Sequence, residues 1–240
     1  MEIFLESGTW IALLTLTFLE IVLGIDNIIF ISIVAGKLPS NKQRKARLIG
    51  LSLALITRIF LLFGITWLVG LTDPIITVKG FALSWKDIIL IAGGLFLIAK
   101  STSEIHHKIE GEDEKENKRI KGGTVFSKAI LQIVLLDIIF SFDSILTAVG
   151  LTHELMLMVI AVIISIVVMM IFAGAISNFI NRHPTLQILA LSFLILIGFM
   201  LGIEALHFHV PKGYIYFAVF FSLVVEVINI RMRTKAIKKL

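Results

Sequence analysis

The sequence predicts an all-α integral membrane fold, and its composition, its apolar runs and the placement of its basic residues each point to that class. Hydrophobic residues make up 58% of the 240 residues, charged residues make up 16%, and the mean hydropathy is +0.99. Soluble domains are about 45–50% apolar and about 25% charged, and a soluble core cannot bury several runs of membrane-spanning length. We therefore expect a single membrane domain over residues 1–240.

Seven apolar runs approach the roughly 20 residues that cross the hydrocarbon layer of a bilayer. They cover residues 10–34, 48–69, 81–99, 126–150, 155–179, 186–206 and 214–230. The third run is the weakest, because Lys86 and Asp87 interrupt it. The first run follows a segment that has two glutamates and no basic residue, so we interpret it as a retained span rather than a secretory signal.

The basic residues predict how the chain is oriented. Eighteen of the 22 Lys and Arg fall on one side of the predicted spans, at 37–47, 100–128, 182 and 231–239. The other side holds Lys79, Lys86 and Lys212, and Arg58 lies within the second span. Because cytoplasmic loops carry the excess of Lys and Arg, we expect the N-terminus outside and the C-terminus in the cytoplasm, in an inner (plasma) membrane. Without the third span the basic tail would lie outside, which favours seven spans over six.

The polar stretch at residues 100–125 separates the first three spans from the rest. It mixes acidic and basic side chains, and we interpret it as a solvated cytoplasmic linker. A regulatory metal-sensing loop that uses His106 and His107 is the alternative.

The first and fourth predicted spans share a motif at an offset of 117 residues. Each copy has an acid, then a small residue four positions later, an aspartate six positions later and a small polar residue seven positions later. The first copy is Glu20, Gly24, Asp26 and Asn27, and the second is Asp137, Ser141, Asp143 and Ser144. Because three spans separate the copies, they run in opposite directions. The sequence therefore predicts an inverted repeat of three plus three helices, residues 10–99 and 126–206. An extra seventh helix (214–230) and a basic cytoplasmic tail (231–240) follow it.

Inverted repeats are a hallmark of secondary transporters, whose sites lie at the repeat interface near the bilayer midplane. Ionisable side chains at that depth cost about 2.5–3.5 kcal/mol each on insertion scales. The predicted spans nevertheless contain Glu20, Asp26, Asp137, Asp143 and Glu226, with Arg58 in the second span and Glu204 near the end of the sixth. One arginine cannot pair with five acids, so protons or a bound cation must neutralise the remainder.

The donor atoms of the motif are hard oxygens, which suit Mg²⁺, Ca²⁺ or Mn²⁺. The sequence has no cysteine, which excludes thiolate metal sites and disulfides. The predicted metal ligands are Glu20, Asp26, Asn27, Asp137, Asp143 and Ser144. The candidate accessory or proton-carrying groups are Glu226, Asn229, Arg58 and Glu204.

Two points of this predicted site stay open from spacing alone. Asp26 and Asp143 lie about 100° from the helical stripe of the other motif residues, so either they line a second face of one cavity or the helices break near Gly24 and Ser141. One acid is expected to pair with Arg58. Glu204 is expected to be an interfacial group, or otherwise an exit-site ligand.

Three segments resemble a known family, and the resemblance covers nearly the whole chain. They are LEIVLGIDN at Leu19–Asn27, RKAR at Arg44–Arg47 and DIIFSFDS at Asp137–Ser144. They resemble the TerC family of bacterial membrane proteins. The resemblance implies Mn²⁺ efflux, including supply of Mn²⁺ to proteins secreted through the membrane, with Glu20, Asp26, Asp137 and Asp143 as the acids needed for export. Other members are linked to tellurite or to pH response, and the two motif copies differ, so the halves need not contribute equally.

The leading hypothesis is therefore a divalent-cation transporter that exports Mn²⁺. One variant of this hypothesis couples export to the exchange of protons. The alternatives are a non-transporting membrane partner that metallates or scaffolds secreted proteins, and a tellurite-resistance or small-cation exporter. An intramembrane aspartyl protease needs a Gly-x-Gly-Asp motif, which neither copy has, so we expect no enzyme. The expected partners are the lipid bilayer, a divalent metal ion and, as a further candidate, secretion machinery. No nucleic acid is expected, and the oligomeric state stays open.

Overall fold

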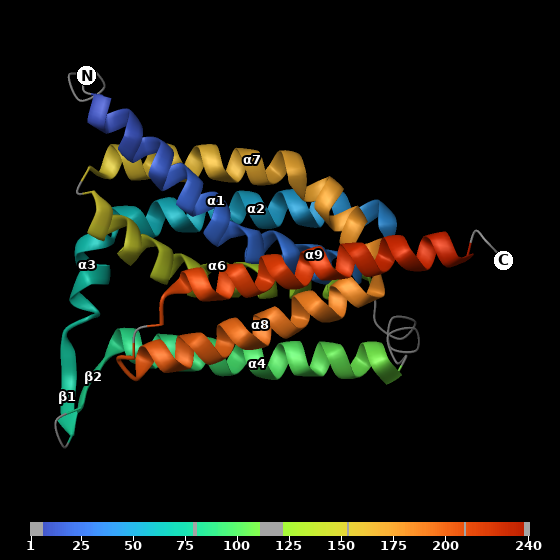
Figure 1. Ribbon diagram of the computed structural model, residues 1–240. Coiled ribbons are helices and arrows are strands. Elements are labelled where there is room, and N and C mark those ends of the chain that lie inside the picture. The colour runs from blue at the N-terminus through green and yellow to red at the C-terminus, as the bar shows by residue number, and fades with distance from the viewer. Residues whose placement is uncertain (1–6, 79–80, 111–121, 153, 209, 238–240) are drawn as a thin grey trace.

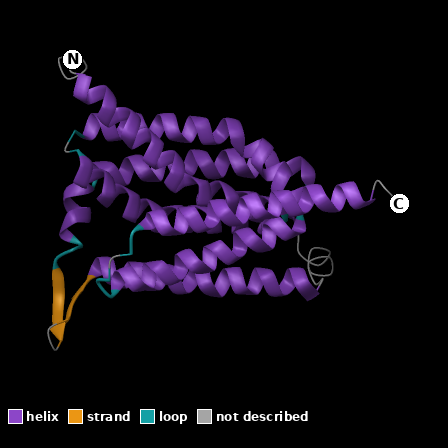
Figure 2. Cartoon of the chain, viewed as in Figure 1, coloured by secondary structure: helices purple, strands orange, loops and turns teal. Residues whose placement is uncertain are grey.

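Most of the described chain is helical (Figures 1 and 2). The computed structural model describes residues 7–78, 81–110, 122–152, 154–208 and 210–237, and some side chains within these ranges, those of Asp26 and Asp143 among them, lie outside the description. The long helices are α1 (Ser7–Gly36), α2 (Ser40–Phe63), α4 (Trp85–Glu110), α6 (Gly122–Leu151), α7 (Leu155–Arg182), α8 (Pro184–Ala205) and α9 (Lys212–Ile237). A short helix α3 (Ile65–Gly70) and an antiparallel hairpin of β1 (Pro74–Val78) and β2 (Phe81–Ser84) connect α2 to α4.

Successive long helices run in alternating directions, so their connections fall at two ends of the bundle (Figure 1). One end holds the N-terminus, α3 and the β-hairpin, and we call it the hairpin end. The other holds the α1–α2 turn, the start of α8 and the C-terminus. We call it the basic end, because Lys37, Arg44, Lys108, Arg182 and Arg231 belong to the helix ends that meet there. The two chain termini therefore lie at opposite ends of the bundle.

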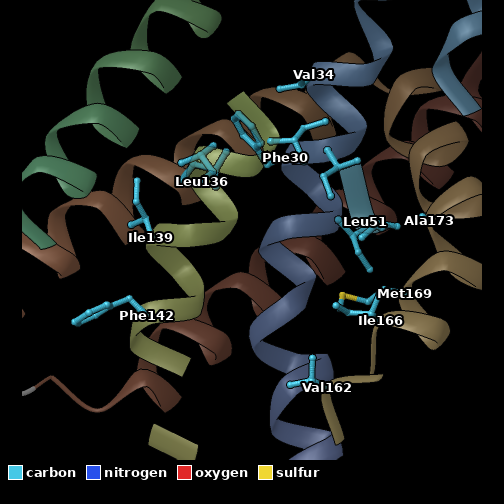
Figure 3. Packing of buried hydrophobic residues seen from close by; sticks show 14 of the residues in the cluster. Phe30, Val34, Leu51, Leu136, Ile139, Phe142, Val162, Ile166, Met169 and Ala173 are labelled. Atoms are coloured by element: carbon cyan, nitrogen blue, oxygen red, sulfur yellow. The ribbon is translucent and has the colours of Figure 1, made fainter. Parts of the chain in front are cut away.

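The closest helix packing joins α1 to α7 and α4 to α8. At the α4–α8 crossing, glycine faces glycine: a Cβ added to Gly198 would lie 2.7 Å from the carbonyl oxygen of Gly94, and one added to Gly94 would meet the carbonyl oxygen of Gly198. Small residues of this kind let helix backbones approach closely in membrane proteins. Buried apolar side chains such as Phe30, Leu136 and Met169 fill the space between α1, α6 and α7 (Figure 3).

Large apolar side chains also cover the outside of the bundle. Phe18, Phe60, Phe172, Phe199 and Phe217 are each more than half exposed, and so much exposed apolar surface calls for a nonaqueous partner. Among the described residues, six helices are long and apolar enough to cross a bilayer: α1, α2, α4, α7, α8 and α9. The chain is therefore an all-α integral membrane protein, with the β-hairpin as an addition that the sequence did not predict. Helix α6 has the same 30-residue length as α1 but is not among those six.

The structure corrects the predicted start of the third span. The prediction begins at residue 81, but α4 begins at Trp85, because the preceding residues form strand β2. The prediction that Lys86 and Asp87 interrupt this span is wrong, because both residues lie in the first turn of α4. The Asp87 backbone N–H donates to Ser84 Oγ at 3.2 Å, and the Ser84 backbone N–H donates to Asp87 Oδ2 at 2.8 Å. This reciprocal pair is a capping box, which starts a helix.

Three helices, α2, α4 and α9, extend well past the predicted apolar runs into charged sequence. Helix α9 continues to Ile237, so residues 231–237 of the predicted basic tail are helical. Helix α2 begins at Ser40 rather than at residue 48, and α4 continues to Glu110. Residues 100–110 of the predicted linker are thus helical, and His106 Nε2 lies 3.2 Å from Glu110 Oε2 on α4. The central part of that linker, residues 111–121, lies outside the described residues. Hydropathy marks only the part of a helix that lies in hydrocarbon, so it misses charged ends that continue into water.

Candidate ion-binding site

Arg58 of α2 is the centre of a buried polar cluster between three helices. Its side chain is 1% exposed. Its Nη1 donates to Glu20 Oε2 of α1 at 2.5 Å, and its Nη2 and Nε donate to Asp137 Oδ1 of α6 at 3.1 and 3.3 Å. A guanidinium presents several N–H donors in one plane, so a single arginine joins α1 and α6 through α2. We call Glu20, Asn27, Arg58, Asp137 and Ser141 the central cluster.

Two neutral side chains complete the central cluster around Asp137. Asn27 Nδ2 donates to Asp137 Oδ1 at 2.9 Å, and Ser141 Oγ donates to Asp137 Oδ2 at 3.3 Å. Asn27 is 5% exposed, and its Oδ1 atom is buried without a hydrogen-bond partner among the described residues. A buried acceptor without a donor costs free energy, so this oxygen is a ready ligand for a proton donor or a cation.

The charges of the central cluster do not balance. With all groups ionised, the carboxylates of Glu20 and Asp137 exceed the guanidinium of Arg58 by one negative charge. Glu20 and Asp137 are 4% and 3% exposed and lie near the middle of their helices. Burial of an unbalanced charge is costly unless a counter-ion or a proton neutralises it. The cluster is therefore able to hold a further positive species.

The sequence predicted that one acid would pair with Arg58, and the structure pairs two of them with it. Helices α1 and α6 run unbroken through both motif copies. The broken-helix alternative is therefore not what the structure has, and the two helices carry their motif residues on regular turns. Ser141 entered the sequence motif only as a small residue, and its bond to Asp137 was missed. Its place four residues after Asp137, one helical turn away, is the signal that could have found it.

Other predicted site residues lie apart from the central cluster or outside the description. Ser144 Oγ donates to the Ser141 carbonyl oxygen of its own helix at 3.3 Å. Glu204 forms an ion pair with Lys86 at 3.4 Å at the hairpin end, where both side chains are about one-quarter exposed. The expectation that Glu204 is an interfacial group stays a prediction.

The remaining predicted residues are Glu226, Asn229, Asp26 and Asp143. Glu226 and Asn229 lie on α9, whose main neighbour is α8, and both are partly exposed. The side chains of Asp26 and Asp143 lie outside the description. Among the described side chains, no three His, Asp or Glu groups converge as a metal site would require. The predicted ligand set therefore remains a prediction. Of its members, the described part of the chain brings Glu20, Asn27 and Asp137 together in the central cluster.

These features define the class: a polytopic helical membrane protein with a cluster of paired ionisable side chains buried inside its bundle. The chain belongs to the TerC family of integral membrane proteins, whose family model matches residues 5–239. It is 52% identical to the "UPF0053 inner membrane protein YgdQ" of Escherichia coli K12, over 94% of each chain. It is 50% identical to a "UPF0053 protein" of Haemophilus influenzae, over 95% of this chain and 96% of that one.

Some relatives are longer than this chain. A "UPF0053 protein" of Buchnera aphidicola is 51% identical over 95% of this chain but only 44% of its own length. The "UPF0053 inner membrane protein YoaE" of Escherichia coli K12 is 47% identical with the same coverage. The chain thus spans slightly less than half the length of these relatives. No solved structure matches the chain.

Proposed function

We propose that this protein is a divalent-cation transporter that exports Mn²⁺ from the cytoplasm. The observation that carries the proposal is the central cluster, in which two buried carboxylates from matching motif positions share one arginine. Carboxylate and amide oxygens are the ligands that Mn²⁺ and similar hard cations prefer. The choice of Mn²⁺ among such cations rests on the activity that the family resemblance implies.

The helix contacts support an inverted repeat in which α1, α2 and α4 match α6, α7 and α8. Such a repeat predicts that each helix contacts its own counterpart, and α1–α6, α2–α7 and α4–α8 are all in contact. It also predicts that contacts come in reciprocal pairs, as α1–α7 and α2–α6 do. The mutual approach of Gly94 and Gly198 is itself reciprocal. The motif helices α1 and α6 then cross at the interface where inverted-repeat transporters hold their ions.

The same repeat makes α6 the seventh membrane span. Helix α6 must then cross the bilayer as α1 does, antiparallel to it, which its 30-residue length allows. The basic end would face the cytoplasm, because the cytoplasmic loops of membrane proteins carry the excess of Lys and Arg. The hairpin end would face the outside of an inner membrane, which is the direction of export.

In the proposed cycle, Arg58 holds Glu20 and Asp137 while no cation is bound. An entering divalent cation takes the carboxylate oxygens from the guanidinium and gains the free Oδ1 atom of Asn27 as a further ligand. Counting Asp26 and Asp143, four motif carboxylates and one guanidinium leave three formal negative charges. One divalent cation and one proton would neutralise them, which makes exchange of metal for protons chemically reasonable.

The test is Mn²⁺ flux into proteoliposomes that contain an Mn²⁺-quenched dye. The variants Glu20→Gln and Asp137→Asn should each lower the initial flux by at least about tenfold, because each removes a charged ligand that contributes more than a neutral one. Asp73→Asn, at an exposed acid in the loop between α3 and β1, is the matched control and should transport normally. Equal flux by all of these variants would refute the assignment.

A second candidate is a non-transporting membrane partner that metallates or scaffolds secreted proteins. The observation that favours it is the pairing of both described carboxylates with Arg58, since such pairing can also serve structure alone. Purified wild-type protein that folds, retains its bilayer orientation and shows no Mn²⁺ flux would favour this candidate over a transporter.

A further inference from the structure

A polar cavity of about 430 Å³ opens at the basic end, at the opposite side of the fold from the β-hairpin. Five helix ends meet around it: the ends of α1, α4 and α7 and the starts of α2 and α8. Its lining includes Lys37, Lys108, Arg182, Gln43, Asn181 and Gln187. The volume lies in the range of small-ligand pockets, and the charged groups among these lining residues are all cations.

Two of the three lining cations have no carboxylate partner among the described residues. Lys37 is paired with Glu104, and Glu104 also holds Lys100 at 2.7 Å. Within the part of the chain that the structure describes, Lys108 and Arg182 form no ion pair with an acid. Two lining cations thus remain for a ligand, and a cation entering here would meet repulsion rather than ligands.

A buried arginine lies behind the cavity wall. Arg47 of α2 is 9% exposed, and its Nη1 donates to Ser177 Oγ of α7 at 3.2 Å. Within the described residues that hydroxyl is its hydrogen-bond partner, and no carboxylate balances its charge. Burial of an uncompensated guanidinium is costly, so a nearby anion would stabilise this region.

A chain of hydrogen bonds links that arginine to the cavity. Asn181 Nδ2 donates to Ser177 Oγ at 3.3 Å, and Gln187 Nε2 donates to Asn181 Oδ1 at 3.1 Å. Gln187 is 6% exposed, lines the cavity, and leaves its Oε1 atom without a hydrogen-bond partner among the described residues. The chain of hydrogen bonds therefore ends at the buried amide of Gln187, a residue of the cavity lining, whose oxygen atom has no partner among the described residues.

The direction of donation along these hydrogen bonds can reverse while the set of heavy-atom positions stays the same. A half-turn of both amides exchanges their oxygen and nitrogen positions, which hydrogen-bond networks alone distinguish. Ser177 Oγ then donates to Asn181 Oδ1, Asn181 Nδ2 donates to Gln187 Oε1, and Gln187 is left with a buried N–H that has no acceptor among the described residues. In this arrangement the Ser177 hydroxyl hydrogen also gains an acceptor.

We propose that this cavity is a binding site for a phosphate group, taken either from solution or from the headgroup of an anionic phospholipid at the basic end. A phosphate oxygen accepts from lysine, arginine and amide N–H groups alike, and charge-assisted bonds of this kind are short and strong. Basic pockets between membrane helices bind anionic headgroups by the same chemistry. This site is separate from the central cluster and does not depend on the proposed transport.

The test uses the full chain in phosphatidylcholine nanodiscs and has two arms. One arm titrates inorganic phosphate by calorimetry at constant ionic strength. The other compares retention of phosphatidylglycerol and phosphatidylcholine by native mass spectrometry. We expect saturable binding in at least one arm, and the arm that responds identifies the source of the phosphate group.

The pocket variant Lys108→Gln with Arg182→Gln should weaken that binding by about tenfold. Its matched control is Lys128→Gln with Arg231→Gln, at exposed positions of the basic end that do not line the cavity, and it should bind normally. Gln187→Glu, which adds a negative charge with almost no change in shape, should also weaken phosphate binding. Absence of saturable binding in both arms, binding unchanged by the pocket variants, or tighter phosphate binding in Gln187→Glu would overturn the proposal.

Discussion

Arg58 of α2 holds α1 and α6 through ion pairs with Glu20 and Asp137. The effect of losing Arg58 follows from these two ion pairs. With the guanidinium removed, Glu20 and Asp137 would remain buried as neighbouring carboxylates whose charges repel each other. Removal of one partner from a buried ion pair is far more damaging than replacement of the whole group by neutral side chains. Arg58 is therefore at once a structural tie and the group that a bound cation must displace.

For Arg58→Gln we expect a loss of about 3–5 kcal/mol in unfolding free energy, because two buried carboxylates lose their partner. Addition of Glu20→Gln and Asp137→Asn should restore most of the loss, since the whole cluster is then neutral. Unfolding in detergent, followed by circular dichroism, measures both. Arg231→Gln, at an exposed arginine of α9, is the control. A triple variant less stable than Arg58→Gln would contradict this account of the cluster.

At the scale of elements, the sequence predicted best those features that depend on residues within a single helix. Apolar run length located the helices, and the acid-to-acid spacing in α1 and α6 found Glu20, Asn27 and Asp137. It failed where tertiary contacts or capping decide. The capping box of Ser84 and Asp87 turns an apparent interruption into a helix start. That two acids share Arg58 depends on how α2 packs between α1 and α6, and no spacing within one helix encodes it.

The crossing of α4 and α8 gives a prediction with a control on the same helix. Gly198→Ala should destabilise the protein by about 1–3 kcal/mol, because the new methyl group would lie 2.7 Å from the Gly94 carbonyl oxygen and must push the helices apart. Gly202→Ala should be neutral or stabilising by up to about 1 kcal/mol, since no atom lies within 4 Å of its added Cβ. Denaturant titration compares the unfolding free energies of the two variants. Equal changes in both would contradict the close approach of α4 and α8 at Gly94 and Gly198.

The capping box gives a smaller effect at the start of α4. Ser84→Ala should cost about 1 kcal/mol, because the Asp87 backbone N–H loses its acceptor at the helix terminus. Ser103→Ala, at an exposed position of the same helix, should change stability by less than about 0.5 kcal/mol. The same denaturant titration measures both variants, and an unchanged Ser84→Ala protein would show that another group starts this helix.

At the scale of the whole molecule, the alternating helices place all connections at two ends and the termini at opposite ends (Figure 1). The sequence predicted alternating spans with the termini on opposite sides, from the apolar runs together with the distribution of the basic residues. What it could not supply is the pairing of α1 with α7 and of α4 with α8, because helix neighbours within a bundle follow from side-chain fit rather than from hydropathy.

Because the chain has no cysteine, single-cysteine variants can map its orientation directly. In intact cells, Asp73→Cys and Thr152→Cys at the hairpin end should react with a membrane-impermeant maleimide. Asn41→Cys and Ser127→Cys at the basic end should react only after the membrane is opened. Ser127 lies near the start of α6 and Thr152 directly follows its end, so this pair tests whether α6 crosses the bilayer. Labelling of both from the same side would refute the seven-span arrangement.

The most direct test of the central claim is anomalous X-ray diffraction from crystals grown with Mn²⁺. If a mobile cation neutralises the buried acids, a manganese peak should lie between α1 and α6, within coordination distance of Asp137 and the Asn27 Oδ1 atom, and Asp137→Asn should abolish it. Strong manganese peaks found only at the surface, with Arg58 still bound to both carboxylates at saturating Mn²⁺, would contradict the claim.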